Sequence, residues 1–260
     1  KASTGNATNQ TVIGYEATGQ ADNSVVLGND NVTAVYMGED SGATVYAASF
    51  VGDGSQLTGI TGSASSLNDL TDVLVDSNSM FLSNPPTNST GGYNTASGRN
   101  SLNSNTTGDN NTASGYYALY LNTTGDKNTA SGSKALYHNT TGDENTAHGY
   151  KSLYDNTTGS YNTASGRESL YENTTGSYNT ASGYKSLYEN TTGEENTAYG
   201  SQSLYKNTTG VENTASGVYS LYYNTTGNHN TTFGYDSMSY NTTGSNNTAS
   251  GYFALQTNTT

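Results

Sequence analysis

The sequence has a strict 17-residue period from Asn94 to the end of the chain. The unit reads Asn-Thr-Ala-Ser-Gly-x-x-(Ser/Ala)-Leu-Tyr-x-Asn-Thr-Thr-Gly-x-x, and it occurs in ten copies. A period this short cannot hold two packed helices, whose repeats run to about 33–47 residues. The array must therefore fold as a stack of small, nearly identical units. The first glycine of the unit marks the register at Gly98, Gly115, Gly132, Gly149, Gly166, Gly183, Gly200, Gly217, Gly234 and Gly251.

Each unit is poor in helix formers and rich in turn residues. Its glycines, asparagines and threonines disfavour a helix, and glycine accepts the positive φ of tight corners. We therefore expect two short strands in each unit, Asn-Thr-Ala-Ser and (Ser/Ala)-Leu-Tyr, with Ala and Leu pointing inward and Thr, Ser and Tyr outward. The fold class is then all-β, a β-solenoid or β-roll of about ten rungs. At about 4.8 Å per rung, the rod is on the order of 50 Å long.

Stacking places each Asn and Thr over its own copy in the next rung. Such ladders satisfy side-chain hydrogen bonds, as in cross-β stacks, so we interpret Asn-Thr-Thr-Gly as a structural turn rather than a ligand site. One Leu and one Ala per rung make a thin core for the length of chain that each rung must order. We therefore expect three chains to pack as a homotrimer that buries a tyrosine column, although a single solenoid can also carry such a column on one face. The column is Tyr120, Tyr137, Tyr154, Tyr171, Tyr188, Tyr205 and Tyr222.

Composition and charge narrow the class of protein. Only 31% of the 260 residues are hydrophobic, too few for a large compact core. Only 11% are charged and 23 are tyrosines, which is unlike a disordered chain. The net charge of −13 disfavours binding to nucleic acid or to an anionic membrane. No apolar stretch approaches the roughly 18 residues of a membrane span, and the absence of cysteine excludes disulfides.

The N-terminal third has a looser pattern. Apolar triplets end in Gly14 and Gly28, and we expect each to be a short strand. A third triplet ends in Gly38, and residues 46–61 read as a strand followed by a Gly-rich loop. Within residues 62–92, Ser66–Val73 reads as a helical turn or a loop. We divide the chain into β-roll-like repeats with a Gly-rich loop (1–61), a non-repetitive connector (62–92) and the solenoid shaft (93–260), with a boundary near residue 90.

Several of these segments resemble known fibrous proteins. The triplets Val-Ile-Gly at 12–14 and Val-Leu-Gly at 26–28 resemble the head repeats of trimeric autotransporter adhesins, which are left-handed β-rolls. The segments Ala48–Ile60 and Ser66–Val73 are similar to stretches of bacteriophage tail fibres. The 17-residue array resembles repeats of such fibres and of bacterial surface proteins. The resemblance implies a trimeric fibre on a virion tail or a cell surface.

No group of residues in the array has the pattern of a catalytic or metal site. His138, His148 and His229 occupy different repeat positions, without metal-ligand spacing. There is no nucleophile elbow, phosphate-binding loop, zinc motif or Ca²⁺-binding nonapeptide. We expect no enzyme, cofactor or metal, and assign no catalytic or binding residue. Most acidic residues fall in the two variable slots after the second glycine, where we expect exposed turns: Asp109, Asp126, Glu144, Glu194, Glu195 and Glu212.

The function we expect is a rigid fibre shaft of a phage tail fibre or cell-surface adhesin. The shaft would hold a receptor-binding part away from the particle, and contact with a host receptor or glycan would use the Tyr and Asn columns. One alternative is a subunit of an extracellular filament assembled head-to-tail, because solenoid ends expose strand edges. Another is an ice-binding solenoid, although paired threonines beside a glycine turn disfavour a flat face. Asn-Thr-Thr is also a glycosylation sequon, so a sugar-coated edge is a further alternative.

Overall fold

The computed structural model describes residues 11–13, 25–27, 74–76, 79–82 and 89–259. The chain divides into two compact units, Lys1–Ile60 and Thr61–Thr260. In the first unit, strands β1 (Thr11–Ile13) and β2 (Val25–Leu27) pair in parallel, with Thr11 opposite Val25. This pairing confirms that the first two apolar triplets are strands in equivalent positions. The features expected around Gly38, at 46–61 and at 66–73 lie outside the described residues.

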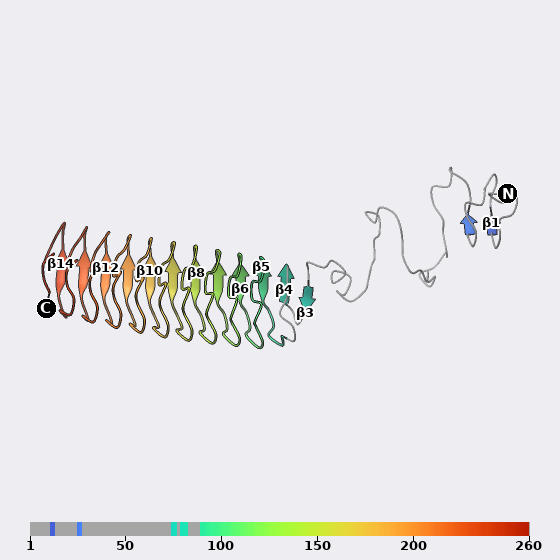
Figure 1. The fold of residues 1–260 in the computed structure, drawn as a ribbon, viewed down its shortest axis with the longest axis horizontal. Coiled ribbons are helices and arrows are strands. Elements are labelled where there is room, and N and C mark those ends of the chain that lie inside the picture. The colour runs from blue at the N-terminus through green and yellow to red at the C-terminus, as the bar shows by residue number, and fades with distance from the viewer. Residues whose placement is uncertain (1–10, 14–24, 28–73, 77–78, 83–88, 260) are drawn as a thin grey trace. The chain divides into compact units, whose positions relative to one another are not determined.

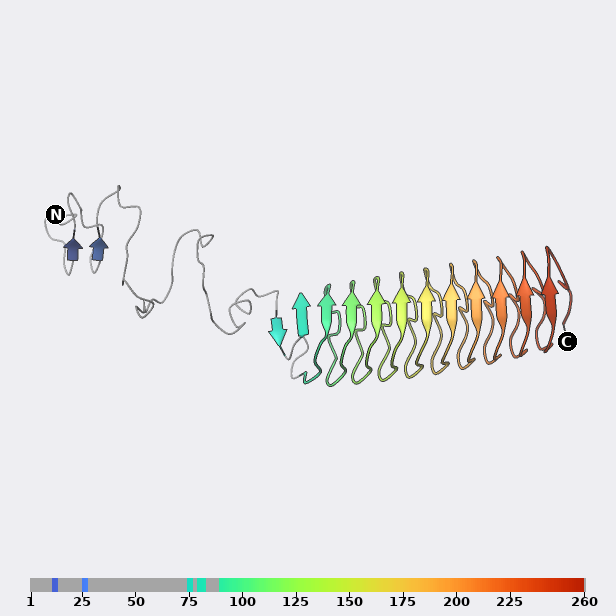
Figure 2. The same ribbon diagram turned by 180° about the vertical axis from the view of Figure 1, so that it is seen from behind.

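The second unit contains one long sheet (Figures 1 and 2). Strand β3 (Leu74–Asp76) is antiparallel to β4 (Ser79–Leu82), and β4 is parallel to β5 (Thr95–Ser97). From β5 to β14 all neighbours are parallel and in chain order. Part of the expected connector thus joins the sheet. The further strands are β6 Thr112–Ser114, β7 Thr129–Ser131, β8 Thr146–His148, β9 Thr163–Ser165, β10 Thr180–Ser182, β11 Thr197–Tyr199, β12 Thr214–Ser216, β13 Thr231–Phe233 and β14 Thr248–Ser250.

Each rung contributes one strand and not the expected two. The (Ser/Ala)-Leu-Tyr segment forms turns, because its Leu and the residue two before it have positive φ, as at Leu153 (49°) and Lys151 (54°). A strand needs strongly negative φ, so the prediction of a second strand is wrong. The segment still bonds from rung to rung: the Leu153 N–H donates to the Ser169 carbonyl over 3.0 Å. The prediction of an all-β solenoid with 17-residue rungs is confirmed, and the described residues contain no α-helix.

Two columns of apolar side chains form the core of the solenoid. In the first eight units the Ala of each strand and the Leu of each turn are buried, as at Ala164 and Leu170, while Thr and Ser beside the Ala point outward, as expected. In the last unit Leu255 is 52% exposed. The ninth unit (residues 230–246) departs from this pattern. It places Thr232 and Met238 in the core, both with no exposed surface, and the Thr232 hydroxyl is hydrogen-bonded to the Ser220 hydroxyl. The core therefore tolerates an exchange when the new polar atom has a partner.

Buried asparagines connect the rungs through their side chains. Asn156 Nδ2 donates to Asn139 Oδ1 and to the Gly159 carbonyl, each over 2.8 Å. Asn145 Nδ2 donates to the same Gly159 carbonyl over 2.8 Å. The pattern recurs along the array and confirms that Asn-Thr-Thr-Gly is a structural turn with an asparagine ladder. The sequon asparagines of this ladder are buried: Asn105, Asn122, Asn139, Asn156, Asn173, Asn190, Asn207, Asn224 and Asn241.

The two glycines of a unit allow the rungs to approach closely. Gly166 has φ +141°, and a Cβ there would lie 2.5 Å from the Gly183 carbonyl oxygen. At Gly159 a Cβ would lie 2.3 Å from the Gly176 carbonyl oxygen. Real Cβ atoms do not approach an oxygen so closely, so a side chain at either position would force adjacent rungs apart.

Candidate functional site

One side of the rod carries a continuous stack of aromatic rings, which we call the tyrosine column. It consists of the residue after each core Leu in seven successive rungs: Tyr120, Tyr137, Tyr154, Tyr171, Tyr188, Tyr205 and Tyr222. Successive ring centroids are 5.0–5.2 Å apart. Near Tyr188 the planes are almost parallel, 3° from Tyr205. The ring spacing follows the rung spacing of a sheet, so the solenoid itself sets the stack.

Rows of charged side chains lie on both sides of the tyrosine column. In one row, Lys185 Nζ lies 4.8 Å from the centroid of the Tyr188 ring and 3.4 Å from Glu168 Oε2. In the other, Lys206 Nζ lies 3.7 Å from Glu189 Oε1. A cation over a ring face is attracted by the ring's quadrupole. Lys185 therefore contacts both the tyrosine column and an acid of the neighbouring rung, whereas Lys206 contacts an acid of the neighbouring rung.

The environment of the tyrosine column shifts its ionisation. Burial raises the pKa of Tyr188 to about 12, against a smaller opposing effect of the Lys185 ammonium. Burial also raises the pKa of Tyr137, Tyr154, Tyr205 and Tyr222. The phenols thus stay protonated at neutral pH, where they can donate hydrogen bonds. Beside the column, burial and the carboxylates of Glu189 and Asp155 raise the pKa of Glu172.

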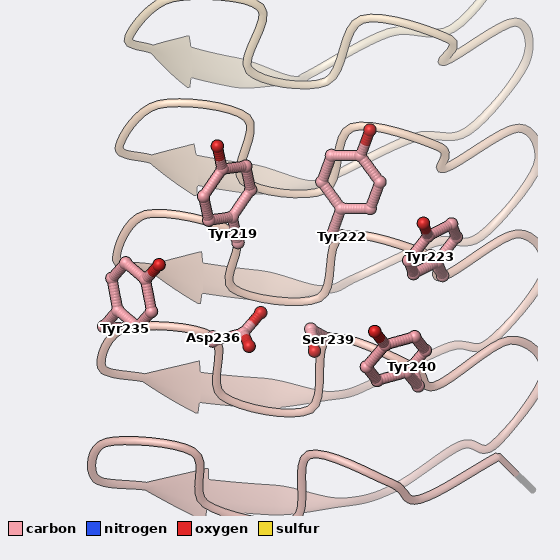
Figure 3. A pocket seen from close by; sticks show the side chains of 7 residues that line it. All are labelled: Tyr219, Tyr222, Tyr223, Tyr235, Asp236, Ser239 and Tyr240. Atoms are coloured by element: carbon pink, nitrogen blue, oxygen red, sulfur yellow. The ribbon is translucent and has the colours of Figure 1, made fainter.

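The tyrosine column ends at the ninth unit, where Ser239 replaces the tyrosine. A cavity of about 340 Å³ opens at this point, and we call it the unit-9 notch (Figure 3). Its lining residues are Tyr219, Tyr222, Tyr223, Tyr235, Asp236, Ser239 and Tyr240. At the other end of the column, a smaller hollow of about 270 Å³ is lined by Tyr116, Tyr117, Tyr120, Lys134 and Tyr137.

The outer face of the parallel sheet presents columns of hydroxyls. In β9, Thr163 and Ser165 lie exposed on either side of the buried Ala164. The parallel register sets Thr163 opposite Thr180 and Ser165 opposite Ser182. Larger side chains interrupt the serine column: His148, Tyr199 and Phe233. These strand threonines are distinct from the Thr-Thr pairs of the turn.

Among the titratable residues singled out from the sequence, His229 and Glu212 come together as a pair. His138 Nδ1 lies 2.7 Å from Asp155 Oδ1, His229 Nε2 lies 3.5 Å from Glu212 Oε1, and His148 is exposed on the sheet. Glu194 and Glu195 are exposed in a turn. Within the described ranges, no group of three or more His, Asp or Glu side chains could hold a metal ion. In the same ranges, no helix is long and apolar enough to cross a membrane.

Sequence reasoning assigned no binding residue and therefore missed the unit-9 notch. A signal was present, because the ninth unit departs from the consensus at Thr232, Phe233, Met238 and Ser239. In a chain that otherwise repeats itself closely, such a cluster of exchanges marks a place where the surface differs.

The comparisons with known proteins add no relative. No protein-family model, no curated protein and no solved structure matches the chain. The fold defines the class: a parallel β-solenoid built from tandem 17-residue rungs.

Proposed function

We propose that the repeat array is the rigid shaft of an extracellular fibre, as in a phage tail fibre or a cell-surface adhesin. It acts as a non-enzymatic spacer. The observation that carries the proposal is the unbroken register from β5 to β14, in which each strand pairs only with the strands before and after it. In such quasi-one-dimensional folds, each added unit extends the rod without changing the contacts of the others. Length is then set by the number of units.

Stiffness follows from the distribution of hydrogen bonds around a rung. Rung 162–178 donates to the next rung from Thr163 in the strand (2.8 Å), from Leu170 in the turn (3.0 Å) and from Thr174 beside the asparagine ladder (3.0 Å). Because the bonds lie on different sides of the rod, bending in any direction stretches some of them. This arrangement suits a spacer that must resist force and proteolysis.

Limited trypsin digestion of the intact chain tests the shaft proposal. The array holds lysines and arginines in several rungs, among them Lys151, Arg167 and Lys185. We expect the peptide bonds after these residues to stay intact in the native chain, because cleavage needs local opening of the backbone. The same trypsin treatment should cut them once urea has unfolded the chain. Rapid cleavage at these three residues in the native chain would contradict a rigid shaft.

We further propose that the shaft assembles as a homotrimer. The tyrosine column is half-buried in a single chain, and lateral packing of three chains would cover the rest of each ring. Light scattering after size exclusion tests this. A mass near three times 27.1 kDa supports the trimer, and a mass near 27.1 kDa contradicts it. A very large, polydisperse mass favours the head-to-tail filament instead.

A second candidate function, ice binding, is supported by the outer face of the parallel sheet. Its outward Thr and Ser positions repeat about every 4.8 Å between strands and about 6.6 Å along a parallel strand, so hydroxyls form a two-dimensional array wherever His148, Tyr199 and Phe233 do not interrupt the serine column. Ice-recrystallisation inhibition tests this candidate. Thr180→Tyr in the centre of the face should abolish the activity, whereas Thr175→Tyr in the turn should leave it unchanged. A wild-type chain without activity would eliminate ice binding.

A further inference from the structure

The unit-9 notch leaves one tyrosine ring face without a stacking partner. Tyr222 stacks on Tyr205 with centroids 5.0 Å apart and planes 9° apart. On the other side of Tyr222, the next rung offers only the short side chain of Ser239 (Figure 3). The notch therefore lies in line with the tyrosine column, at the position that a tyrosine ring occupies in the preceding rungs.

Aromatic rings also form the side walls of the notch. On one side, Tyr219 meets Tyr222 edge to face, with centroids 5.7 Å apart, and Tyr235 of the next rung lies 6.0 Å from Tyr219. On the other side, Tyr223 and Tyr240 stack on each other with centroids 5.3 Å apart. Figure 3 shows these two walls on either side of Asp236 and Ser239.

Two polar side chains line the notch between its walls. Ser239 is 2% exposed, and its buried Oγ has no hydrogen-bond partner among the described residues. A buried hydroxyl without a partner is uncommon and costs free energy, so a ligand that supplies one gains affinity. Asp236 accepts a hydrogen bond from Gln256 Nε2 at one carboxylate oxygen, and a carboxylate has further lone pairs to offer.

We propose that the unit-9 notch binds a pyranose ring of a glycan. One C–H face of the sugar stacks on Tyr222, and its hydroxyls pair with Ser239, Asp236 and the tyrosine phenols. The volume of about 340 Å³ is at the small end of the range for ligand pockets. The assignment rests on the proposed function for its biological role, which is attachment of the shaft to a surface glycan.

Other occupants match the chemistry of the notch less well. A quaternary ammonium ligand such as choline would use the ring faces, but it brings a single hydroxyl to a site lined by a serine, an aspartate and several phenols. A tyrosine from a second copy would complete the stack, but it brings a single hydroxyl to a site lined by a serine, an aspartate and several phenols. A sugar combines an apolar face with a rim of hydroxyls, which is the combination the notch presents.

Titration of the full-length chain with simple sugars tests the site. The probes are the methyl glycosides of glucose, galactose, mannose and N-acetylglucosamine, observed by saturation-transfer difference NMR and by tyrosine fluorescence, since the chain has no tryptophan. We expect at least one to bind with a dissociation constant on the order of 1 mM, as for a small ligand with few atoms. Ser239→Tyr should fill the notch and weaken binding by about tenfold or more.

Two further variants distinguish binding in the notch from nonspecific binding to the exposed tyrosines. Asp236→Asn keeps the shape but removes a charged acceptor, and should weaken binding by about threefold to tenfold. Tyr150→Ala removes an exposed tyrosine several rungs away and should leave binding unchanged. Equal losses in Tyr150→Ala and Ser239→Tyr would overturn the site.

Other outcomes also overturn the assignment. One is that none of the four glycosides binds at concentrations well above the expected dissociation constant. A second is that the wild type and Ser239→Tyr bind equally well. A third is that choline binds more tightly than every sugar. A fall in solution mass on Ser239→Tyr would assign the notch to a second copy of the chain. Trypsin resistance of the same samples reports on the shaft alone: a resistant array without sugar binding removes the site and keeps the shaft.

Discussion

The side-chain nitrogen of Asn156 donates a hydrogen bond to the side-chain oxygen of Asn139, one rung away, over 2.8 Å. Its second N–H bonds to the Gly159 carbonyl, and its oxygen accepts from Asn173 over 2.7 Å. The buried amide thus has a partner for both N–H groups and for its oxygen. Because satisfied buried polar networks rigidify and specify a structure, this ladder defines the register that the thin Ala and Leu core could not fix alone.

Substitution of a ladder asparagine tests its contribution to stability. Asn139→Ala removes the bonds to Asn122 and Gly142 and leaves one of the two side-chain N–H groups of Asn156 without an acceptor. Orphaned buried groups cost about 1–3 kcal/mol each, so we expect a loss of about 3 kcal/mol or more in urea denaturation. Thr141→Ala, exposed in the same turn, should change stability by less than about 0.5 kcal/mol. Equal effects of the two substitutions would contradict a stabilising ladder.

Two residues with the same backbone conformation should respond in opposite ways to glycine. Gln202 and Leu204 have φ of 57° and 50°, which strains a residue with a Cβ by about 1–2 kcal/mol. Gln202→Gly should stabilise the chain by about 0.5–1 kcal/mol after the entropy cost of glycine. Leu204→Gly should destabilise it, because a lost buried leucine costs about 2–5 kcal/mol or more. Thermal unfolding of both variants measures whether each is more or less stable than the wild type. A Gln202→Gly variant less stable than the wild type would refute the strain argument.

High pH should unfold the array through the tyrosine column. The pKa of Tyr188 is raised to about 12 by burial from an ordinary value of 10.0, so folding favours the protonated phenol. Its stabilising contribution is complete below about pH 10 and is lost as the pH rises through about 12. We expect the melting temperature, followed by circular dichroism, to fall across this window. The melting temperature of the Tyr188→Phe variant should fall less steeply with pH. An identical pH dependence for the variant and the wild type would contradict a role of Tyr188 in the loss of stability.

Charge removal beside the column should be stabilising. Burial, Glu189 and Asp155 raise the pKa of Glu172, so its carboxylate is disfavoured in the folded chain. Glu172→Gln should raise the melting temperature at pH 7. The gain should shrink as the pH falls through the raised pKa, because the wild-type carboxyl then becomes neutral as well. Glu194→Gln, in an exposed turn, is the control, and an equal gain there would show that only net charge matters.

The strict period explains why much of the fold could be predicted. Once Ala164 and Ala181 are recognised as the same position of successive repeats, stacking of like on like follows, and with it the buried columns and the Asn ladder. The second strand could not be excluded from the sequence, because leucine and lysine, which occur at Leu153 and Lys151, are not residue types that favour positive φ. The rung imposes that conformation through its bonds to neighbouring rungs.

The candidate site was harder to predict than the fold. The exchange of tyrosine for Ser239 is visible in the sequence, but its consequence depends on where neighbouring rungs place their rings. Tyr223 and Tyr240 meet across rungs only because the solenoid stacks them. A departure from a repeat therefore indicates where to look, and the geometry of adjacent rungs indicates what it could bind.

Small-angle X-ray scattering of the wild type and of a variant lacking residues 145–178 tests the central claim most directly. The deletion removes two complete units of the array. A shaft of independent stacked rungs should keep its cross-section and shorten by about 10 Å, two rungs at about 4.8 Å each. A changed cross-section, an unchanged length or a compact scattering profile would contradict the account.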